Sequence, residues 1–460
     1  MNTMTATCST PRLLLAAPQS GSGKTTLFCG ILRALLDKGV RAAAFKSGPD
    51  YIDPMFHAQV VGAPSRNLDI FLTGRDNVRR LFAKTADGAD LALLEGAMGF
   101  YDGMADTTDG SAYDLARTVQ APVVLILNGK GAALSLGAMI KGFREFRRDS
   151  GIQGVILNNV TKMTYQFYQK ILEEETGVRL YGYFPRLEDA GLESRHLGLV
   201  TAGEVGNLES LVSRWAGQAA ESIDLEGLQE LARTAPPLAY EPLPLEPLGQ
   251  VRIAVARDKA FCFYYQDALD LLEALGADLV PFSPLTDQHL PDCDGLYIGG
   301  GYPELYAAQL ADNTGLRTEL REKLADGLPC YAECGGFMYL MESFCDGDKE
   351  YPWVGAVRGH CWMTKRLVRF GYVNLTAQED NVLCPAGGTI AAHEFHYSDS
   401  DANGASFVAV KARRALSWPC AQATRTLYAG YPHIHLWGNP EFAKNFVRAC
   451  VQYQGKGGRE

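Results

Sequence analysis

The chain contains 460 residues, 47% of them hydrophobic and 21% charged, which is typical of a folded protein with room for two hydrophobic cores. A formal net charge of −10 disfavours a general nucleic-acid-binding or acidic-membrane-binding surface, so a bound anion needs individually placed basic residues. No stretch has the length and apolarity of a signal peptide or a membrane-spanning helix. The eleven cysteines are scattered without zinc-ligand spacing, as is typical of reduced thiols. We expect a cytoplasmic protein without a structural disulfide or zinc, and without nucleic-acid or membrane partners.

A phosphate-binding loop lies near the start of the chain. The apolar run 13–17 precedes Gln19-Ser-Gly-Ser-Gly-Lys-Thr-Thr26, the order of strand, glycine-rich turn and helix start that the phosphates of a nucleoside triphosphate require. Pro18 occupies the position where this motif usually has a glycine, and since proline has no N–H, one phosphate contact must be lost or moved. The loop predicts binding of ATP or GTP with Mg²⁺ by Gly21, Ser22, Gly23, Lys24, Thr25 and Thr26, with Thr25 also a metal ligand.

Acidic residues follow two of the predicted strands in the same part of the chain. The apolar run 91–94 ends in Glu95, where a sheet that carries a phosphate loop needs an oxygen ligand for Mg²⁺; a hydrogen bond to the next turn is the alternative. The prolines and glycine of residues 46–57 predict a loop over the strand ends, although Asp53-Pro54 alone suggests a helix start and His57 alone the first turn of a helix. Here Lys46 could neutralise a transferring phosphoryl group, while Asp50 and Asp53 could hold Mg²⁺ or orient a nucleophile. We assign to the substrate and phosphoryl group Lys46, Asp50, Tyr51 and Asp53.

The order of these runs predicts two α/β domains. In residues 1–235, short apolar strands alternate with helix-like stretches such as 25–38, which predicts a P-loop domain with a mostly parallel sheet. Five prolines between positions 236 and 249 predict a semi-rigid linker. The pattern restarts at residue 251, so residues 250–460 form a second domain, with antiparallel strands expected over 351–410 and a closing helix over 441–454.

The second domain contains the residues of a cysteine nucleophile. Cys334 follows an apolar strand and precedes two glycines and a helix-like stretch, the shape of a nucleophile elbow in which the helix N-terminus favours the thiolate. The N–H groups of Gly300, in a triple-glycine turn, and of Gly335 could form an oxyanion hole. His433 is the candidate base, and His435, which projects the same way from an extended segment, is a candidate third or auxiliary group.

These motifs together carry a resemblance to a known family. The Cys-Gly-Gly turn, the Gly-Gly-Gly-Tyr-Pro-Glu turn before it and the late histidine resemble class I glutamine amidotransferases, and the first domain resembles dethiobiotin synthetase-like ATPases. Their fusion in this order resembles the cobyrinic acid a,c-diamide synthase family over nearly the whole chain. The additional matching segments are Phe45-Lys-Ser-Gly-Pro-Asp-Tyr-Ile-Asp-Pro54, Arg66-Asn-Leu-Asp69, Glu95-Gly-Ala-Met-Gly99, Arg195-His-Leu-Gly-Leu199 and His393-Glu-Phe-His-Tyr397.

The resemblance implies a cobalamin-biosynthetic ligase that uses ATP and L-glutamine, or ammonia, to amidate the a and c carboxylates of cobyrinic acid. It implies an acyl phosphate in the first domain and a thioester on Cys334 in the second. Relatives of this family act on hydrogenobyrinic acid or nickel sirohydrochlorin, and these acceptors stay open, as does the oligomeric state, with a homodimer among the options. A regulatory or partitioning ATPase is the distant alternative. Most class I amidotransferases have a glutamate two residues after the catalytic histidine, where this chain has His435.

Overall fold

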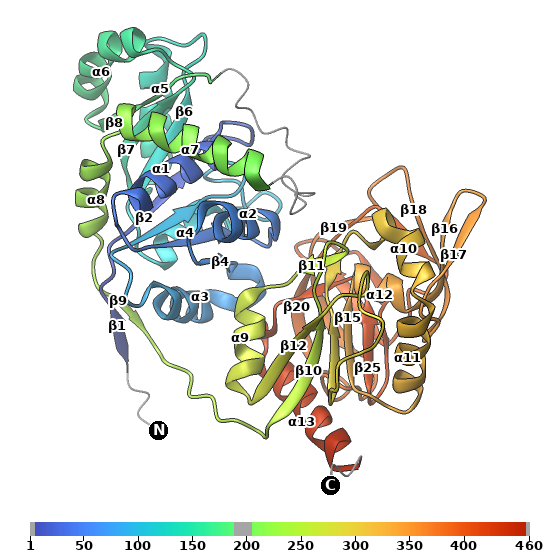
Figure 1. Cartoon of the computed structure of the whole chain (residues 1–460). Coiled ribbons are helices and arrows are strands. Elements are labelled where there is room, and N and C mark those ends of the chain that lie inside the picture. Colours follow the sequence, from blue (N-terminus) through green and yellow to red (C-terminus); the bar gives the residue numbers. More distant parts are fainter. Residues whose placement is uncertain (1–4, 188–204, 457–460) are drawn as a thin grey trace. The chain divides into compact units, whose positions relative to one another are not determined.

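The computed structural model describes residues 5–187 and 205–456, and these residues form two compact α/β units (Figure 1). The first unit runs to Ile70 and from Gly74 to Leu243, and the second comprises Phe71–Thr73 and the chain from Pro244 onward. The segment Arg195–Leu199 lies outside the described residues. Each unit is built on a predominantly parallel sheet flanked by helices, so the predicted fold class is confirmed. No helix in the described part of the chain combines the length and the apolarity needed to cross a membrane.

The first unit has a seven-stranded sheet in which every neighbouring pair of strands is parallel. Across the sheet the strands are β4 (Ser65–Leu68), β3 (Ala42–Ser47), β5 (Leu91–Glu95), β2 (Arg12–Ala16), β6 (Val123–Asn128), β7 (Ile152–Asn158) and β8 (Arg179–Phe184). The helices are α1 (Lys24–Asp37), α2 (Ile52–Phe56), the π-helix His57–Val61, α3 (Ile70–Ala86), α4 (Ala112–Thr118), α5 (Ser135–Phe146), α6 (Lys162–Thr176), α7 (Val205–Ser222) and α8 (Leu225–Arg233). Parallel strands align their carboxyl ends, so this topology gathers the phosphate loop, Lys46 and Glu95 at one edge.

Helices cover both faces of this sheet, which explains why its strands are apolar at successive positions. Alternate residues of β2, β3 and β5 belong to one core with α1 and α7, which lie side by side on one face (Figure 1). Gly30 of α1 permits this close approach, because a Cβ there would lie 3.0 Å from the carbonyl oxygen of Trp215 in α7. On the other face, Phe45 of β3 packs against Phe82 of α3, with ring centroids 5.0 Å apart.

Trp215 is the largest fully buried side chain of this core, so we expect its truncation to destabilise the first unit. Trp215→Ala should lower the free energy of unfolding by about 3–5 kcal/mol, because α1 and α7 cannot collapse into the space left by the indole. Hydrogen exchange of the amides of α1, measured by mass spectrometry, reports the change. The control is Phe167→Ala on α6, where the ring is 66% exposed. A loss under about 1 kcal/mol for Trp215→Ala would contradict the packing described here.

The second unit is built on a six-stranded sheet that is parallel except for its last pair. Its order is β12 (Ala277–Phe282), β10 (Val251–Ala256), β13 (Gly295–Ile298), β15 (Cys330–Glu333), β25 (Leu427–Gly430) and β24 (Gln422–Ala423). The helices are α9 (Gln266–Ala274), α10 (Ala307–Asp312), α11 (Thr314–Ala325), α12 (Gly335–Leu340) and α13 (Pro440–Lys456), with 3₁₀ turns at Pro303–Tyr306 and Leu436–Gly438. One core joins alternate residues of the central strands to α10, α11 and α12.

Smaller sheets complete the second unit and bring a distant histidine next to the main sheet. A two-stranded sheet pairs β11 (Phe261–Phe263) with β14 (Gly300–Gly301). The order of a four-stranded sheet is β17 (Lys349–Pro352), β16 (Met341–Asp346), β18 (Val357–Met363) and β21 (Ser398–Ser400). A five-stranded antiparallel sheet has the order β23 (Ser417–Cys420), β22 (Phe407–Lys411), β19 (Arg369–Ala377), β20 (Thr389–His396) and β26 (His433–Ile434). Residues 351–410 are thus largely antiparallel as predicted, although β16 and β18 form a parallel pair.

Two segments differ from their predicted local structure. The prediction of a loop throughout residues 46–57 is wrong, because Asp53 and Pro54 lie in the first turn of α2. Proline is tolerated there because the first N–H groups of a helix have no intrahelical partner to lose. In the proline-rich stretch 236–249, β9 (Leu238–Tyr240) pairs antiparallel with β1 (Ala6–Cys8). This short two-stranded sheet fixes the first residues of that stretch on the first unit.

Candidate active sites in the two units

The phosphate loop connects β2 to α1, and two of its glycines adopt left-handed backbone conformations. Gly21 has φ 75°, and Gly23, the N-cap of α1, has φ 85° and ψ 21°. A Cβ on Gly23 would clash with the side-chain amide of Asn158, which donates a hydrogen bond to the Ser22 carbonyl (2.9 Å). Asn158, at the end of β7, therefore fixes the loop from outside the motif. Sequence analysis missed it, although a polar residue that ends a buried apolar strand is a usable signal.

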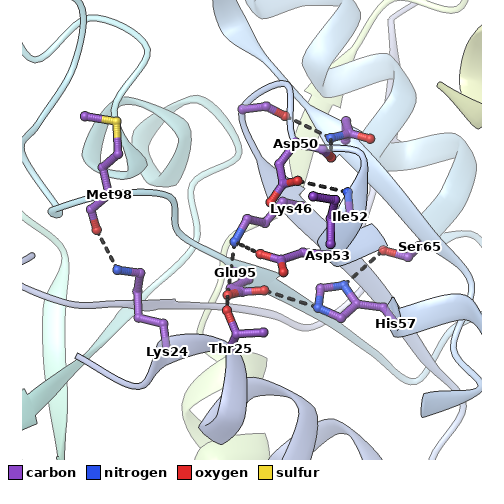
Figure 2. A network of polar contacts seen from close by, with 12 residues as sticks. Lys24, Thr25, Lys46, Asp50, Ile52, Asp53, His57, Ser65, Glu95 and Met98 are labelled. Atoms are coloured by element: carbon purple, nitrogen blue, oxygen red, sulfur yellow. Dashed lines mark hydrogen bonds and ion pairs between the residues drawn. The ribbon is translucent and has the colours of Figure 1, made fainter. Parts of the chain in front are cut away.

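Lys24 and Thr25 begin α1 and point their polar atoms in two directions (Figure 2). Lys24 Nζ donates to the carbonyls of Gln19 (3.1 Å) and Met98 (2.6 Å), so the side chain folds back over the loop. Burial, with the nearby charge of Lys46, lowers the pKa of Lys24 to about 8. Thr25 Oγ1 instead donates to Glu95 Oε1 (2.6 Å), and Thr26 follows in the same turn of the helix.

Glu95 is the centre of a buried polar network in the first unit (Figure 2). Lys46 Nζ lies 3.0 Å from Glu95 Oε1 and also forms an ion pair with Asp53. On the other side, His57 Nε2 lies 3.2 Å from Glu95 Oε2, while His57 Nδ1 is 3.2 Å from Ser65 Oγ. The parallel register of β3 and β5 pairs Lys46 with Glu95, which explains why residues so far apart in sequence meet.

The charges in this network determine the ionisation of its carboxyl groups. Burial alone would raise the pKa of Glu95, but the positive charge of Lys46 and hydrogen bonds from His57 and Thr25 lower it to about 2. Burial lowers the pKa of Lys46 because it favours the neutral amine, but the negative charges of Glu95 and Asp53 outweigh burial, and the net direction is upward. Burial and the charge of Asp53 raise the pKa of Asp50 to about 7. Glu95 is thus ionised at neutral pH, which a metal ligand requires.

The remaining predicted residues of this site lie at the start of α2. Asp50 Oδ1 accepts the N–H of Ile52 (2.9 Å), and the side-chain amide of Asn67 donates to the carbonyls of Gly48 (2.9 Å) and Asp50 (2.7 Å). Tyr51 is buried beside them. Sequence analysis missed the contact of His57 with Glu95, because only the fold brings β5 and the end of α2 together.

Two side chains at the base of the phosphate loop, Thr25 and Glu95, offer oxygens of the kind that bind a magnesium ion. Thr25 Oγ1 and the ionised Glu95 lie within 2.6 Å of each other, and Mg²⁺ takes one or two protein oxygens and completes its shell with phosphates and water. Among residues 5–187 and 205–456, no group of three His, Cys, Asp or Glu side chains could form an all-protein metal cage. A cation at this site therefore needs the oxygens of water or of a bound nucleotide as further ligands.

In the second unit, Cys334 lies in the sharp turn between β15 and α12. Its φ of 47° and ψ of −105° are sterically strained for a residue with a side chain, and such strain persists only where surrounding contacts hold it. The Cys334 N–H donates to the Gly430 carbonyl (2.8 Å), and its own carbonyl accepts from Met338 (2.9 Å). Cys334 is 9% exposed, and all eleven cysteines of the chain are free.

His433 and the triple-glycine turn lie beside the turn that contains Cys334. The negative charges of Cys334 and Glu333, together with a hydrogen bond to Cys334, outweigh burial and raise the pKa of His433 to about 10. A Cβ on Gly300 would lie 2.7 Å from His433 Cε1, so this glycine leaves room for the imidazole. A Cβ on Gly335 would lie 2.8 Å from Pro303 Cδ and 3.2 Å from the Gly301 nitrogen, which places both glycine turns beside each other.

His435 has surroundings unlike those of His433. Its ring stacks on Tyr265, with centroids 4.6 Å apart, and neither ring nitrogen has a hydrogen-bond partner among the residues that the structure describes. Burial lowers the pKa of His435 to about 3, so it is a neutral packing group. A carboxylate that sequence analysis missed, Glu333, lies instead 3.6 Å from His433 Nδ1. It directly precedes Cys334, and an acidic residue at the end of an apolar run was the signal available in the sequence.

Two family models match separate parts of the chain. Residues 13–199 match the model of the CobQ/CobB/MinD/ParA nucleotide binding domain, and residues 252–441 match that of the CobB/CobQ-like glutamine amidotransferase domain. The chain is thus a nucleotide-binding unit joined to a glutamine amidotransferase unit. The signal recognition particle 54 kDa protein of Aeropyrum pernix K1, in complex with GDP, is 19% identical at a TM-score of 0.30, covering 45% of this chain and 49% of that one.

Full-length relatives define the family more closely. The cobyrinate a,c-diamide synthase of Caldanaerobacter subterraneus subsp. tengcongensis is 38% identical over 448 residues, covering 96% of this chain and 99% of the relative. That of Methanothermobacter thermautotrophicus is 40% identical over 452 residues, covering 96% of this chain and all of the relative. The chain belongs to the cobyrinate a,c-diamide synthase family, and the resemblance seen in its motifs is confirmed.

Proposed function

We propose that the chain uses ATP, Mg²⁺ and glutamine to amidate the a and c side-chain carboxylates of cobyrinic acid in cobalamin biosynthesis. One observation carries the proposal: a single chain of this family contains both a phosphate loop beside ionised Glu95 and a strained cysteine, Cys334, beside His433. The partners are then ATP, L-glutamine and an anionic tetrapyrrole. Free thiols throughout agree with a cytoplasmic enzyme.

In the first unit, the acceptor carboxylate attacks the γ-phosphorus of ATP, forming an acyl phosphate and releasing ADP. The loop N–H groups from Gly21 to Gly23, with Ser22, Lys24 and Thr26, bind the phosphates. Thr25 and Glu95 would hold Mg²⁺, which neutralises charge on the transferring phosphoryl group when bound. We assign to the acceptor and phosphoryl group Lys46, Asp50, Tyr51 and Asp53; of these, Lys46 contacts Glu95 and forms an ion pair with Asp53.

In the second unit, the Cys334 thiolate attacks the side-chain amide carbon of glutamine. The oxyanion is stabilised by the N–H groups of Gly300 and Gly335, and His433 delivers a proton to the departing ammonia. Water, deprotonated by His433, then hydrolyses the thioester to glutamate and regenerates the thiol. Ammonia attacks the acyl phosphate, forming the amide and releasing phosphate, so each amide consumes one ATP and one glutamine.

The close approach of Gly300 to His433 gives a prediction for the second site. Gly300→Ala should reduce glutamine-dependent amidation at least about 100-fold, because the added methyl group displaces the imidazole that its Cβ would approach to 2.7 Å. Ammonia-dependent amidation should stay unchanged. Gly315→Ala is the control, since its Cβ would lie 3.4 Å from the nearest described atom, the Gln288 carbonyl oxygen. Equal activities of Gly300→Ala and the control with glutamine would exclude this placement of His433.

The acceptor is tested by offering three tetrapyrroles to the purified chain with ATP, Mg²⁺ and glutamine. We expect cobyrinic acid to gain the mass change of two amidations, with two phosphates released for each product, measured by mass spectrometry and a phosphate assay. Hydrogenobyrinic acid and nickel sirohydrochlorin are the competing acceptors. Faster double amidation of either would reassign the substrate, and failure of all three with glutamine and with ammonia would overturn the proposed function.

A further inference from the structure

Glu333, the last residue of β15, is a buried carboxylate in direct contact with the proposed catalytic histidine. It is 1% exposed, so its charge cannot be solvated by bulk water. Its Oε1 accepts hydrogen bonds from the Ile434 N–H (2.8 Å) and from the Tyr331 hydroxyl. Its Oε2 lies 3.6 Å from His433 Nδ1, and within the described residues this is the one ion pair that Glu333 forms.

The strand geometry explains why these groups meet. Tyr331 and Glu333 are two residues apart in a strand and therefore project to the same side. Glu333 pairs with Gly430 across the parallel β15–β25 ladder, and the chain reaches His433 three residues later. A carboxylate kept in such a place costs several kcal/mol unless an opposite charge and hydrogen bonds offset its desolvation. Its Oε1 is fully used by hydrogen bonds, which leaves Oε2 for the imidazole.

We infer that Glu333 is the positioning residue that orients His433 and stabilises its imidazolium during glutamine hydrolysis. The sequence alone suggested His435 for this role. The inference rests on the proposed function. With Nδ1–H directed at Glu333, the other ring nitrogen is left to face Cys334 and exchange its proton. His435 cannot do this, because it is stacked on Tyr265 and neutral.

In this arrangement one proton moves from Cys334 to His433 and then to ammonia. His433 takes the Cys334 proton, becoming imidazolium, and then transfers that proton to the departing ammonia. Glu333 stays ionised throughout and receives no proton, in the manner of the aspartate of a serine-protease triad. The 3.6 Å separation exceeds a hydrogen bond, and catalytic hydrogen bonds in ligand-free sites commonly shorten when the substrate binds.

The test is Glu333→Gln, which keeps an oxygen to accept the Ile434 N–H but removes the charge. We expect glutamine hydrolysis to fall about 100- to 10,000-fold in kcat, with ammonia-dependent amidation within twofold of the unaltered chain. Alkylation of Cys334 by iodoacetamide at pH 7 should slow at least tenfold, which a merely structural role would not cause in a folded variant. Glu333→Asp, which retains the charge, should recover part of both rates.

Two control substitutions distinguish a role of Glu333 from the loss of any carboxylate and from a role of His435. Glu342→Gln removes an exposed carboxylate that accepts the Gly359 N–H (2.9 Å), and should leave all rates unchanged. His435→Gln should retain far more glutaminase than Glu333→Gln. Normal glutaminase and alkylation rates in Glu333→Gln, or a loss confined to His435→Gln, would overturn the role of Glu333. Failure of the unaltered chain to hydrolyse glutamine would instead contradict the proposed function itself.

Discussion

Cys334→Ser should abolish glutamine-dependent amidation, by at least about 1,000-fold in kcat, while leaving ammonia-dependent amidation intact. The serine hydroxyl is a far weaker nucleophile than a thiolate, and His433 is arranged to pair with a thiolate's charge. The substitution is nearly isosteric in a turn fixed by hydrogen bonds to Gly430 and Met338, so the elbow should keep its conformation. Product formation with each nitrogen source, followed by mass spectrometry, measures both activities.

The matched control for this substitution is Cys345→Ser in β16, a half-buried thiol outside the elbow. It should amidate normally with glutamine and with ammonia. If folded Cys334→Ser lost the ammonia-dependent reaction as well, the nitrogen-supplying and carboxylate-activating steps would not be separable. Retention of the glutamine-dependent reaction would remove Cys334 from the chemistry.

Lys24→Ala should eliminate amidation with either nitrogen source, by at least about 100-fold in kcat/KM for ATP. Lys24 begins α1 directly after the glycine turn and is 8% exposed, so little water shields its charge, and this burial lowers its pKa to about 8. A phosphate placed there gains a strong electrostatic contact, which alanine cannot supply. The loop should stay folded, because the hydrogen bond from Asn158 to Ser22 does not involve Lys24.

Lys38→Ala provides the comparison, since Lys38 is exposed at the C-cap of the same helix. We expect its ATP-dependent rates to equal those of the unaltered chain. Amidation by Lys24→Ala at the rate of this control would exclude the lysine from catalysis. Loss of the glutamine reaction alone would assign Lys24 to communication with the second site instead of phosphate binding.

Features encoded by contiguous residues were accessible from the sequence. The strand, glycine turn and helix around Lys24 and the elbow at Cys334 each occupy a short segment whose backbone demands are visible in the residue types. The alternation of apolar runs likewise predicted a mostly parallel sheet in the first unit and a second α/β domain after the proline-rich stretch. Asp53-Pro54 alone suggested the helix start that the structure has, but the prolines and glycine of residues 46–57 taken together favoured a loop.

Contacts between distant segments were not accessible in the same way. Asn158 with Ser22, His57 with Glu95 and Glu333 with His433 depend on strand order and register, which no local pattern specifies. The spacing rule of related amidotransferases pointed to His435, two residues beyond His433. The fold instead brings a carboxylate to the histidine from the neighbouring strand, beside the nucleophile.

The most direct test of the account follows one carboxylate oxygen and one nitrogen through a single turnover. Cobyrinic acid labelled with ¹⁸O in its carboxylates is incubated with ATP, Mg²⁺ and glutamine labelled with ¹⁵N in its side-chain amide. If carboxylate activation and glutamine hydrolysis are joined through an acyl phosphate, mass spectrometry will find ¹⁵N in each new amide and one ¹⁸O in each released phosphate. Amidated product accompanied by unlabelled phosphate would contradict the acyl phosphate, and with it the proposed division of chemistry between the two units.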